Sequence, residues 1–148
     1  LSFRFEQLVG ENKENGRCVI SFPKKIFCEY QNKSKKILVS NGKSLLIKNR
    51  TNNQKYFYNL KSTMLNLILD KDYLINSIKE AELRIIDEKY INFLIKKDGN
   101  ELSIFFDKRD LNLTGWQTQD IYKNLVITFI TDIKINKNIN EKLFILPD

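Results

Sequence analysis

The chain has 148 residues, of which 42% are apolar, and 25 Lys and Arg against 18 Asp and Glu give a formal net charge of +7. A chain of this length buries roughly two-thirds of its extended surface, enough for one domain with a real core. No apolar run reaches about eighteen residues, which excludes a transmembrane helix. Histidine is absent, which excludes a Ser-His-Asp triad, a histidine base and a histidine zinc site.

Period-two alternation between polar turns dominates the first sixty residues and predicts strands. The first strand places Phe3, Phe5 and Val9 on one face and ends at the polar stretch 10–16. The next two strands, 17–22 and 26–31, flank the turn at Pro23. Their inward-facing side chains should face each other and are Cys18, Ile20, Phe22, Ile26, Cys28 and Tyr30.

Cys18 and Cys28 lie at equal distances from Pro23, so they should stand opposite each other across this hairpin. Two interpretations stay open. The cysteines are either two small buried apolar residues or a disulfide, which would agree with an oxidising compartment.

Three further strands follow at 37–40, 44–48 and 55–59, the first two joined by Asn41-Gly42, a strong signal for a type I′ hairpin turn. In the last of them, Tyr56-Phe57-Tyr58 lies beside Lys55 and would suit a nucleic-acid stacking platform. We instead expect a strand packed on both faces and no nucleic-acid partner.

The period then changes to that of a helix, with Ser62 as its expected cap. The apolar residues of this helical segment, which we expect to cover the sheet, are Met64, Leu65, Ile68 and Leu69. Alternation resumes at 83–87, 90–96, 102–107, 111–118 and 125–131. The sequence therefore predicts a mainly β fold: about eleven antiparallel strands in one unclosed, curved half-barrel, with a helical lid inserted after the sixth strand, as a single domain over residues 1–148.

Chemistry-bearing motifs are scarce. The paired carboxylates Asp70/Asp72 and Asp107/Asp110 sit where turns and helix ends usually carry Asp, and the five Gly residues form no phosphate-binding loop. We expect no enzyme, cofactor or metal. The Lys excess is interpreted as solubility, although clusters such as 33–36 could contact lipid headgroups or nucleic acid.

The order of these segments resembles the family of the periplasmic outer-membrane lipoprotein carrier LolA. The resemblance rests on the opening stretch 5–7, on the hairpin from Phe22 to Tyr30, and on Val39-Ser40-Asn41-Gly42-Lys43. It continues through the helix at 62–69, the stretches 102–107 and 113–116, Asp120, and the segments 126–129 and 143–147. It covers nearly the whole chain.

The resemblance implies a periplasmic chaperone of a Gram-negative bacterium, a monomer that holds acyl chains of lipoproteins in an apolar cavity. It would receive them from an inner-membrane lipoprotein-releasing transporter and pass them to an outer-membrane acceptor. Eight strand residues and four helix residues are the expected cavity lining, with ordinary core packing as the alternative for each: Phe3, Phe5, Cys18, Ile20, Phe22, Ile26, Cys28, Tyr30, Met64, Leu65, Ile68 and Leu69. A carrier or sensor of another lipid is the alternative function.

Two departures from the family qualify this expectation. The family's signal peptide and first helix are expected to be missing from this chain. The family's Arg that tethers the lid in the closed state matches Phe22, so we expect the lid to open and close differently or the cargo to differ.

Overall fold

A computed structural model describes residues 1–119, 123–135 and 138–147 of the chain. Asp120, one of the residues that carry the family resemblance, lies outside this part. Among the described residues no helix is both long and apolar enough to cross a membrane.

In the described ranges, eleven antiparallel strands form one sheet in the order β6-β5-β4-β3-β2-β1-β11-β10-β9-β8-β7, which confirms the predicted fold class. The strands are β1 (Ser2–Val9), β2 (Asn12–Ser21), β3 (Lys25–Tyr30), β4 (Ile37–Asn41), β5 (Ser44–Lys48), β6 (Lys55–Asn59), β7 (Glu82–Ile86), β8 (Tyr90–Lys97), β9 (Asn100–Asp107), β10 (Leu113–Gln119) and β11 (Leu125–Lys134). Every neighbour follows in sequence except β1 and β11, whose pairing joins the two halves.

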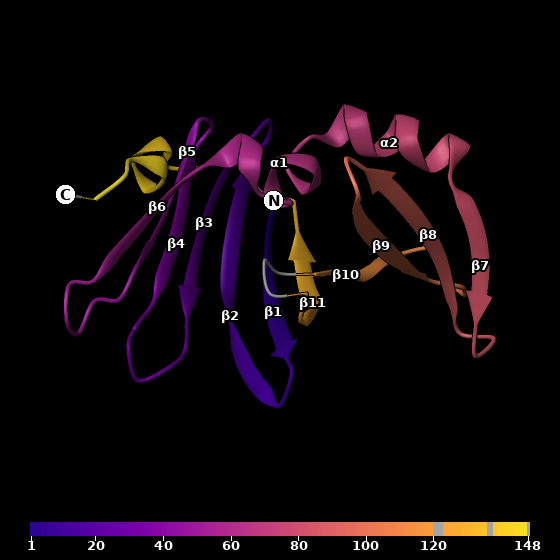
Figure 1. Cartoon of the computed structure of the whole chain (residues 1–148), viewed down its shortest axis with the longest axis horizontal. Coiled ribbons are helices and arrows are strands. Elements are labelled where there is room, and N and C mark those ends of the chain that lie inside the picture. Colours follow the sequence, from indigo (N-terminus) through magenta and orange to yellow (C-terminus); the bar gives the residue numbers. More distant parts are fainter. Residues whose placement is uncertain (120–122, 136–137, 148) are drawn as a thin grey trace.

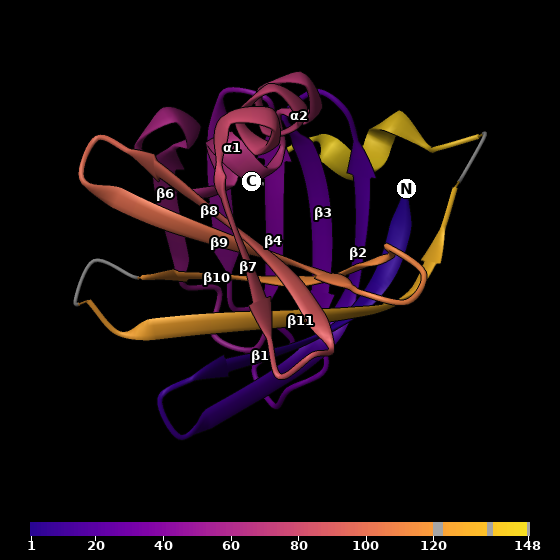
Figure 2. The ribbon, with the colours of Figure 1, turned by 90° about the vertical axis from the view of Figure 1, so that its right-hand side faces the viewer.

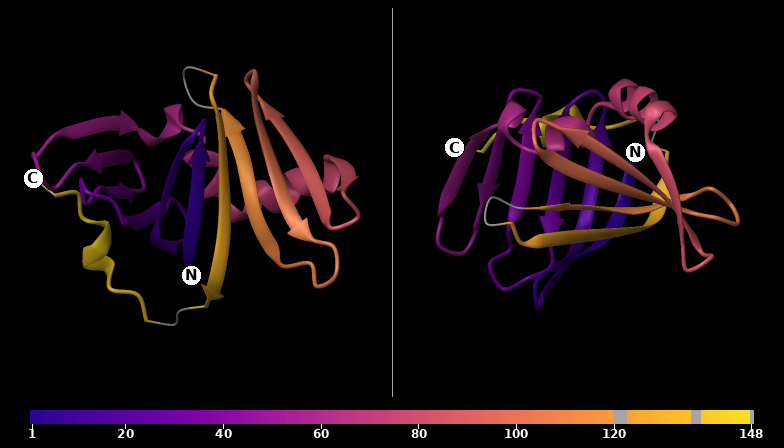
Figure 3. Two further views of the ribbon diagram at one scale, coloured as in Figure 1. Left: turned by 90° about the horizontal axis from the view of Figure 1, so that it is seen from below. Right: turned by 45° about the vertical axis from the view of Figure 1, so that its right-hand side comes forward.

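The sheet coils so that its two halves face each other across a concave interior. Figure 1 shows β1–β6 on one side and β7–β10 on the other, with helices above them. In Figure 2 the strands of the second half run across those of the first, and Figure 3 shows that β6 and β7 do not meet. These two strands are the sheet's free edges.

Two predicted connections differ from the structure. Residues 12–16, expected in a loop, belong to β2, because Asn12 pairs with Val9 and only Gly10 and Glu11 lie between the strands. Residues 12–16 are mostly polar and lack the apolar alternation that predicts a strand. The predicted Asn41-Gly42 turn is shifted by one residue, because Asn41 ends β4 and Gly42 and Lys43 connect it to β5. Of these two, only Gly42 has a positive φ, so the turn is not type I′. Instead, the Asn41 side chain accepts hydrogen bonds from the Lys43 and Ser44 amides.

Helical segments replace the strands after β6. They are the 3-10 helix η1 (Leu60–Ser62) and the α-helices α1 (Leu65–Ile68) and α2 (Lys71–Glu80). Ser62 ends η1 rather than capping a helix, and the α1 cap position, Met64, has no side-chain cap. Asp70 caps α2 by accepting a hydrogen bond from the Tyr73 amide at 3.0 Å. A carboxylate at this position stabilises a helix N-terminus, which explains this Asp without catalysis.

Two apolar clusters lie on the concave side. The first joins β1–β5 to η1 and the start of the lid, and its fully buried members include Leu60 and Leu69. The second packs Ile95, Leu102 and Ile104 of β8 and β9 beneath α1 and α2. The lid therefore spans both halves of the sheet.

The outer face of the first half has a cover of its own. The chain ends in the 3-10 helix η2 (Glu141–Phe144), which contacts β3 and β4. Phe144 is only 3% exposed, and Val39 and Leu46, which face away from the first cluster, are buried as well. Lys25 of β3 forms an ion pair with Glu141 at 3.2 Å. The central strands of this half are thus buried on both faces.

Candidate functional site

An apolar cavity of about 180 Å³ lies between the concave face of the sheet and α1. Strands from both halves and the lid contribute to its walls. The lining residues are Phe3, Phe5, Gln7, Cys18, Ile26, Cys28, Tyr30, Leu38, Thr63, Met64, Leu65, Ile68, Trp116, Thr118, Val126 and Thr128. The wall is largely free of charge, so the cavity suits an uncharged, apolar ligand.

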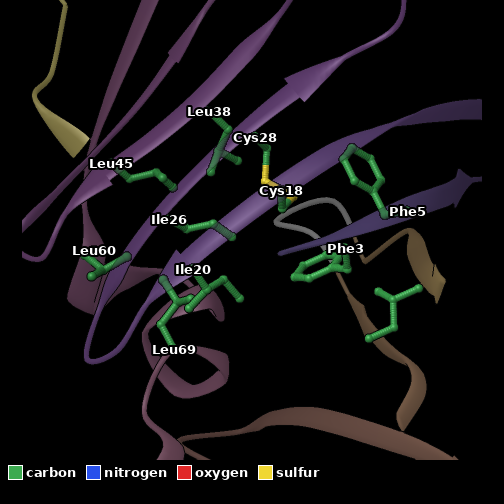
Figure 4. Packing of buried hydrophobic residues seen from close by; sticks show 11 residues of the cluster. Phe3, Phe5, Cys18, Ile20, Ile26, Cys28, Leu38, Leu45, Leu60 and Leu69 are labelled. Carbon is green, nitrogen blue, oxygen red and sulfur yellow. A yellow bond between two sulfur atoms is a disulfide. The ribbon is translucent and has the colours of Figure 1, made fainter. Parts of the chain in front are cut away.

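Most of the residues expected to line a cavity lie in this wall. They are Phe3, Phe5, Cys18, Ile26, Cys28, Tyr30, Met64, Leu65 and Ile68. Ile20 and Leu69 are buried in the first cluster without lining the cavity. Figure 4 shows Ile20 and Leu69 close together, with Phe3, Phe5 and the cysteines farther along the sheet.

Phe22, which was expected to line the cavity, lies outside its wall. Its side chain is 40% exposed and does not line the cavity. The reason is local: β2 ends at Ser21, and Phe22 belongs to the turn into β3, so the alternation that would direct it inward no longer applies.

Cys18 and Cys28 pair directly across β2 and β3 and are joined by a disulfide on the cavity wall. Their Cα atoms are 4.1 Å apart. Of the two interpretations that the sequence left open, the structure has the disulfide. The link closes a small loop and joins two of the strands that line the cavity.

A glycine next to the cavity allows an aromatic pair. Gly16 of β2 lies opposite Phe5 on β1 and Tyr30 on β3. A Cβ at Gly16 would meet the Glu29 carbonyl oxygen and lie 3.0 Å from Phe5 Cε1, so only glycine fits. The Phe5 and Tyr30 rings pack edge to face, 5.0 Å between centroids. Together the rings form part of the cavity's apolar wall.

Tyr30 closes the wall toward the β3–β4 loop. The Lys36 ammonium lies 4.0 Å from its ring centroid and forms an ion pair with Glu14 at 2.7 Å. Burial, and to a lesser degree the negative charge of Glu14, raises the pKa of the Tyr30 hydroxyl. The hydroxyl is therefore neutral at physiological pH and adds no charge to the cavity.

Sequence reasoning missed the wall built by the second half. Trp116 of β10 packs edge to face on Phe3, with 6.3 Å between ring centroids. Gln7 donates a hydrogen bond to Thr128 Oγ1 at 3.0 Å, across the β1–β11 pairing. The other residues missed were Leu38, Thr63, Thr118 and Val126. Alternation within 125–131 could have identified Val126 and Thr128, but the pairing of strands so distant in sequence could not be read.

Lys24 holds the lid to the sheet from the β2–β3 turn. Its amide donates to the Leu69 carbonyl at 3.0 Å, and its ammonium donates to the Asn66 carbonyl and, at 2.8 Å, to Asn66 Oδ1. The ammonium also lies 3.6 Å from Asp70 Oδ2. A polar tether that Phe22 cannot supply is thus formed two residues further along, against the lid.

Lys24 is itself held in position. It has a φ of +73°, a conformation that costs a non-glycine residue roughly 1–2 kcal/mol. Its carbonyl accepts a hydrogen bond from Ser40 Oγ at 2.7 Å, and Ser40 Oγ in turn accepts one from the Gly42 amide. Ser40 is fully buried. The sheet therefore pre-orients the residue that contacts the lid.

The other carboxylates have structural partners. Asp107 accepts hydrogen bonds from the Arg109 amide and guanidinium, which lower the pKa of its carboxyl, and Asp110 accepts one from the Asn112 amide. Within the described ranges, no three Asp, Glu or Cys side chains gather in a metal-binding arrangement. These contacts explain Asp107 and Asp110 as residues that stabilise a turn.

The fold and the cavity together define a class: an open half-barrel whose apolar interior lies under a helical lid. The family model of the outer membrane lipoprotein carrier protein LolA matches residues 1–146, and the chain belongs to this family. One similar solved structure is that of a LolA superfamily protein from Nitrosomonas europaea, with 7% sequence identity and a TM-score of 0.48 over 98% of this chain and 90% of that one. Curated proteins yield no match in sequence.

Proposed function

We propose that this chain is a periplasmic carrier that binds the acyl chains of lipoproteins in the cavity under its lid. It would take cargo from an inner-membrane lipoprotein-releasing transporter and deliver it to an outer-membrane acceptor. Membership in the LolA family supports the class of cargo. The apolar cavity between sheet and lid is the observation that carries the proposal, because it is suited to binding rather than catalysis.

The strength of acyl binding makes a movable lid necessary. Burying an acyl chain gains on the order of 0.8 kcal/mol per methylene, so a long chain gains ~10 kcal/mol. A lipoprotein carries several such chains, and an affinity built from several gains of that size would release cargo too slowly for handover. The present cavity of about 180 Å³ is also below the roughly 300–1,000 Å³ of small-molecule sites. We therefore interpret this structure as a closed form, in which α1 must move to admit cargo.

Lys24 is the group that this movement must release. Its ammonium contacts Asn66 and Asp70, which lie on and just beyond α1. Because Lys24 and Asp70 are partly exposed, we expect these side-chain contacts to contribute about 1–2 kcal/mol together, far less than an acyl chain gains on burial. Cargo binding can therefore displace the contacts, and the empty lid closes again when the cargo leaves.

A carrier of a different lipid is the second candidate, and the small volume of the cavity favours it. A free lipid with one chain needs less space than the several acyl chains of a lipoprotein. A lipoprotein carrier and a carrier of another lipid would use the same cavity wall and the same lid, so only the bound ligand distinguishes the two functions.

The test is native mass spectrometry of the purified chain mixed with a triacylated lipopeptide and, separately, with a phospholipid. A lipopeptide complex supports the first proposal, and a phospholipid complex alone supports the second. Leu65→Glu, which places a charge in the cavity wall, should abolish binding. Phe22→Glu, on the exposed turn, is the matched control and should bind normally. If neither ligand binds, both proposals fail.

A further inference from the structure

The net positive charge of the chain is concentrated at one end of the sheet. Residues 30–69 contain no Asp or Glu and hold eight basic residues: Lys33, Lys35, Lys36, Lys43, Lys48, Arg50, Lys55 and Lys61. The rest of the chain holds 17 basic and 18 acidic residues and is nearly neutral. The segment 30–69 contains β4, β5 and β6, the end of the sheet at the left of Figure 1, followed by η1 and α1.

Few of these charges have partners. Lys36 is paired with Glu14 and Arg50 with Glu29. For the other six, no ion pair is found within the described part of the chain. Lys48 of β5 even lies directly opposite Lys55 of β6. Like charges at such a cross-strand position destabilise a sheet, which favours an anionic partner from outside the chain.

The edge strand beside these charges is aromatic and exposed. Tyr56, Phe57 and Tyr58 are 51%, 62% and 44% exposed, which corrects the expectation that this strand packs on both faces. β6 is the last strand of the sheet, and within the described part of the chain no element buries these three side chains. Exposed aromatic side chains are common where proteins bind one another.

The backbone of β6 offers a free hydrogen-bonding edge. The Asn49 amide donates to the Gln54 carbonyl and the Leu60 amide to the Lys43 carbonyl, both at 2.9 Å. Between these two hydrogen-bonded pairs, every second residue pair of β5 and β6 is hydrogen-bonded. In that register Lys55, Phe57 and Asn59 point their amide and carbonyl groups away from β5. Such an alternating row is what an added strand needs.

We propose that β6 is a docking edge for an acidic, extended segment of another protein, which adds to the sheet as a further strand. The free backbone groups supply the pairing, Phe57 supplies apolar contact, and the unpaired lysines select carboxylates. A second copy of the chain is a poor occupant, because pairing β6 with β6 would bring two basic edges together. This surface lies outside the cavity wall, so the proposal stands or falls independently of the proposed function.

The test is an NMR titration of the full chain with an eight-residue peptide that alternates Glu and Val. The amides of Lys55, Phe57 and Asn59 should show the largest shift changes, and added salt should weaken binding. The peptide that alternates Lys and Val should not bind. Shift changes that map elsewhere, or equal binding of both peptides, would overturn the proposal.

Charge reversals give the matched comparison. Lys48→Glu/Lys55→Glu should weaken binding of the Glu-Val peptide at least about tenfold. Lys89→Glu/Lys108→Glu changes the net charge equally at exposed positions near the opposite edge and should stay within about twofold. Equal weakening by both variants would mean binding through net charge alone and would overturn the docking edge.

A backbone variant separates strand addition from simple attraction. Phe57→Pro removes an outward-pointing amide and should abolish binding, whereas Phe57→Ala keeps the amide and should bind more tightly than the Pro variant. Thermal melts followed by circular dichroism check that both fold, and the charge reversals carry the test if the Pro variant does not. Binding to phosphatidylglycerol vesicles but not to the peptide would assign the surface to anionic membranes and overturn the proposal.

Discussion

The two halves of the sheet bury their strands differently. In the β1–β6 half, β3 and β4 lie between the first apolar cluster and η2, and a disulfide joins β2 to β3. In the β7–β11 half the second cluster is smaller, and Leu83 and Ile85 of β7 are more than half exposed. The comparison suggests a rigid platform, the β1–β6 half, facing a lightly packed half on which the lid can shift.

The largest expected contrast is in stability. Leu46 is fully buried in the β1–β6 half, and Leu46→Ala should lower the free energy of unfolding by about 3–5 kcal/mol through lost packing and the cavity left behind. Leu83→Ala, at the exposed edge of the other half, should cost less than about 0.5 kcal/mol. Urea unfolding of both variants measures the difference. Equal costs would contradict the idea of a rigid platform.

The disulfide should account for the next largest effect. The double variant Cys18→Ala/Cys28→Ala should lose about 2–3 kcal/mol, because it frees a closed loop in the unfolded chain. A thiol reductant should lower the melting temperature of the wild-type chain and leave that of the double variant unchanged. A reductant effect on both would show that stability depends on something other than this link.

A smaller effect is expected where the lid meets the platform. Lys24→Met removes the side-chain contacts with Asn66 and Asp70 and should lower the free energy needed to open the lid by about 1–2 kcal/mol. Hydrogen exchange should quicken in α1 and α2 and stay unchanged in β2 and β3. Lys25→Met is the neighbouring control, since Lys25 contacts Glu141 and not the lid. Equal hydrogen exchange in the lid of both variants would show that Lys24 does not hold the lid to the sheet.

The smallest effect is a pH dependence confined to the platform. The pKa of Tyr30 is raised in the folded chain, so above its ordinary value of about 10 the unfolded state loses a proton that the folded state keeps. Stability should therefore fall as pH rises above about 10, by up to about 1.4 kcal/mol per pH unit from this group. Tyr30→Phe should lack this part of the slope in chemical unfolding at pH 9 to 11. An identical slope in the variant would exclude Tyr30.

Much of the platform could be predicted because its pairings are local. Alternation along adjacent hairpins gave the inward faces of β1, β2 and β3, and placed Cys18 opposite Cys28. The change of period after β6 located the lid. The polar start of β2 was missed, because strand formation there depends on pairing with β1 rather than on its own side chains.

The sequence by itself determined the strand order along the chain, the inward residues within β1, β2 and β3 and the place of the lid, since each depends on neighbours in sequence. The tertiary structure alone decided which cavity residues the second half contributes, that Lys24 and not Phe22 contacts the lid, and that β6 is left bare. These depend on the pairing of β1 with β11 and on the coil of the whole sheet, which no local pattern encodes.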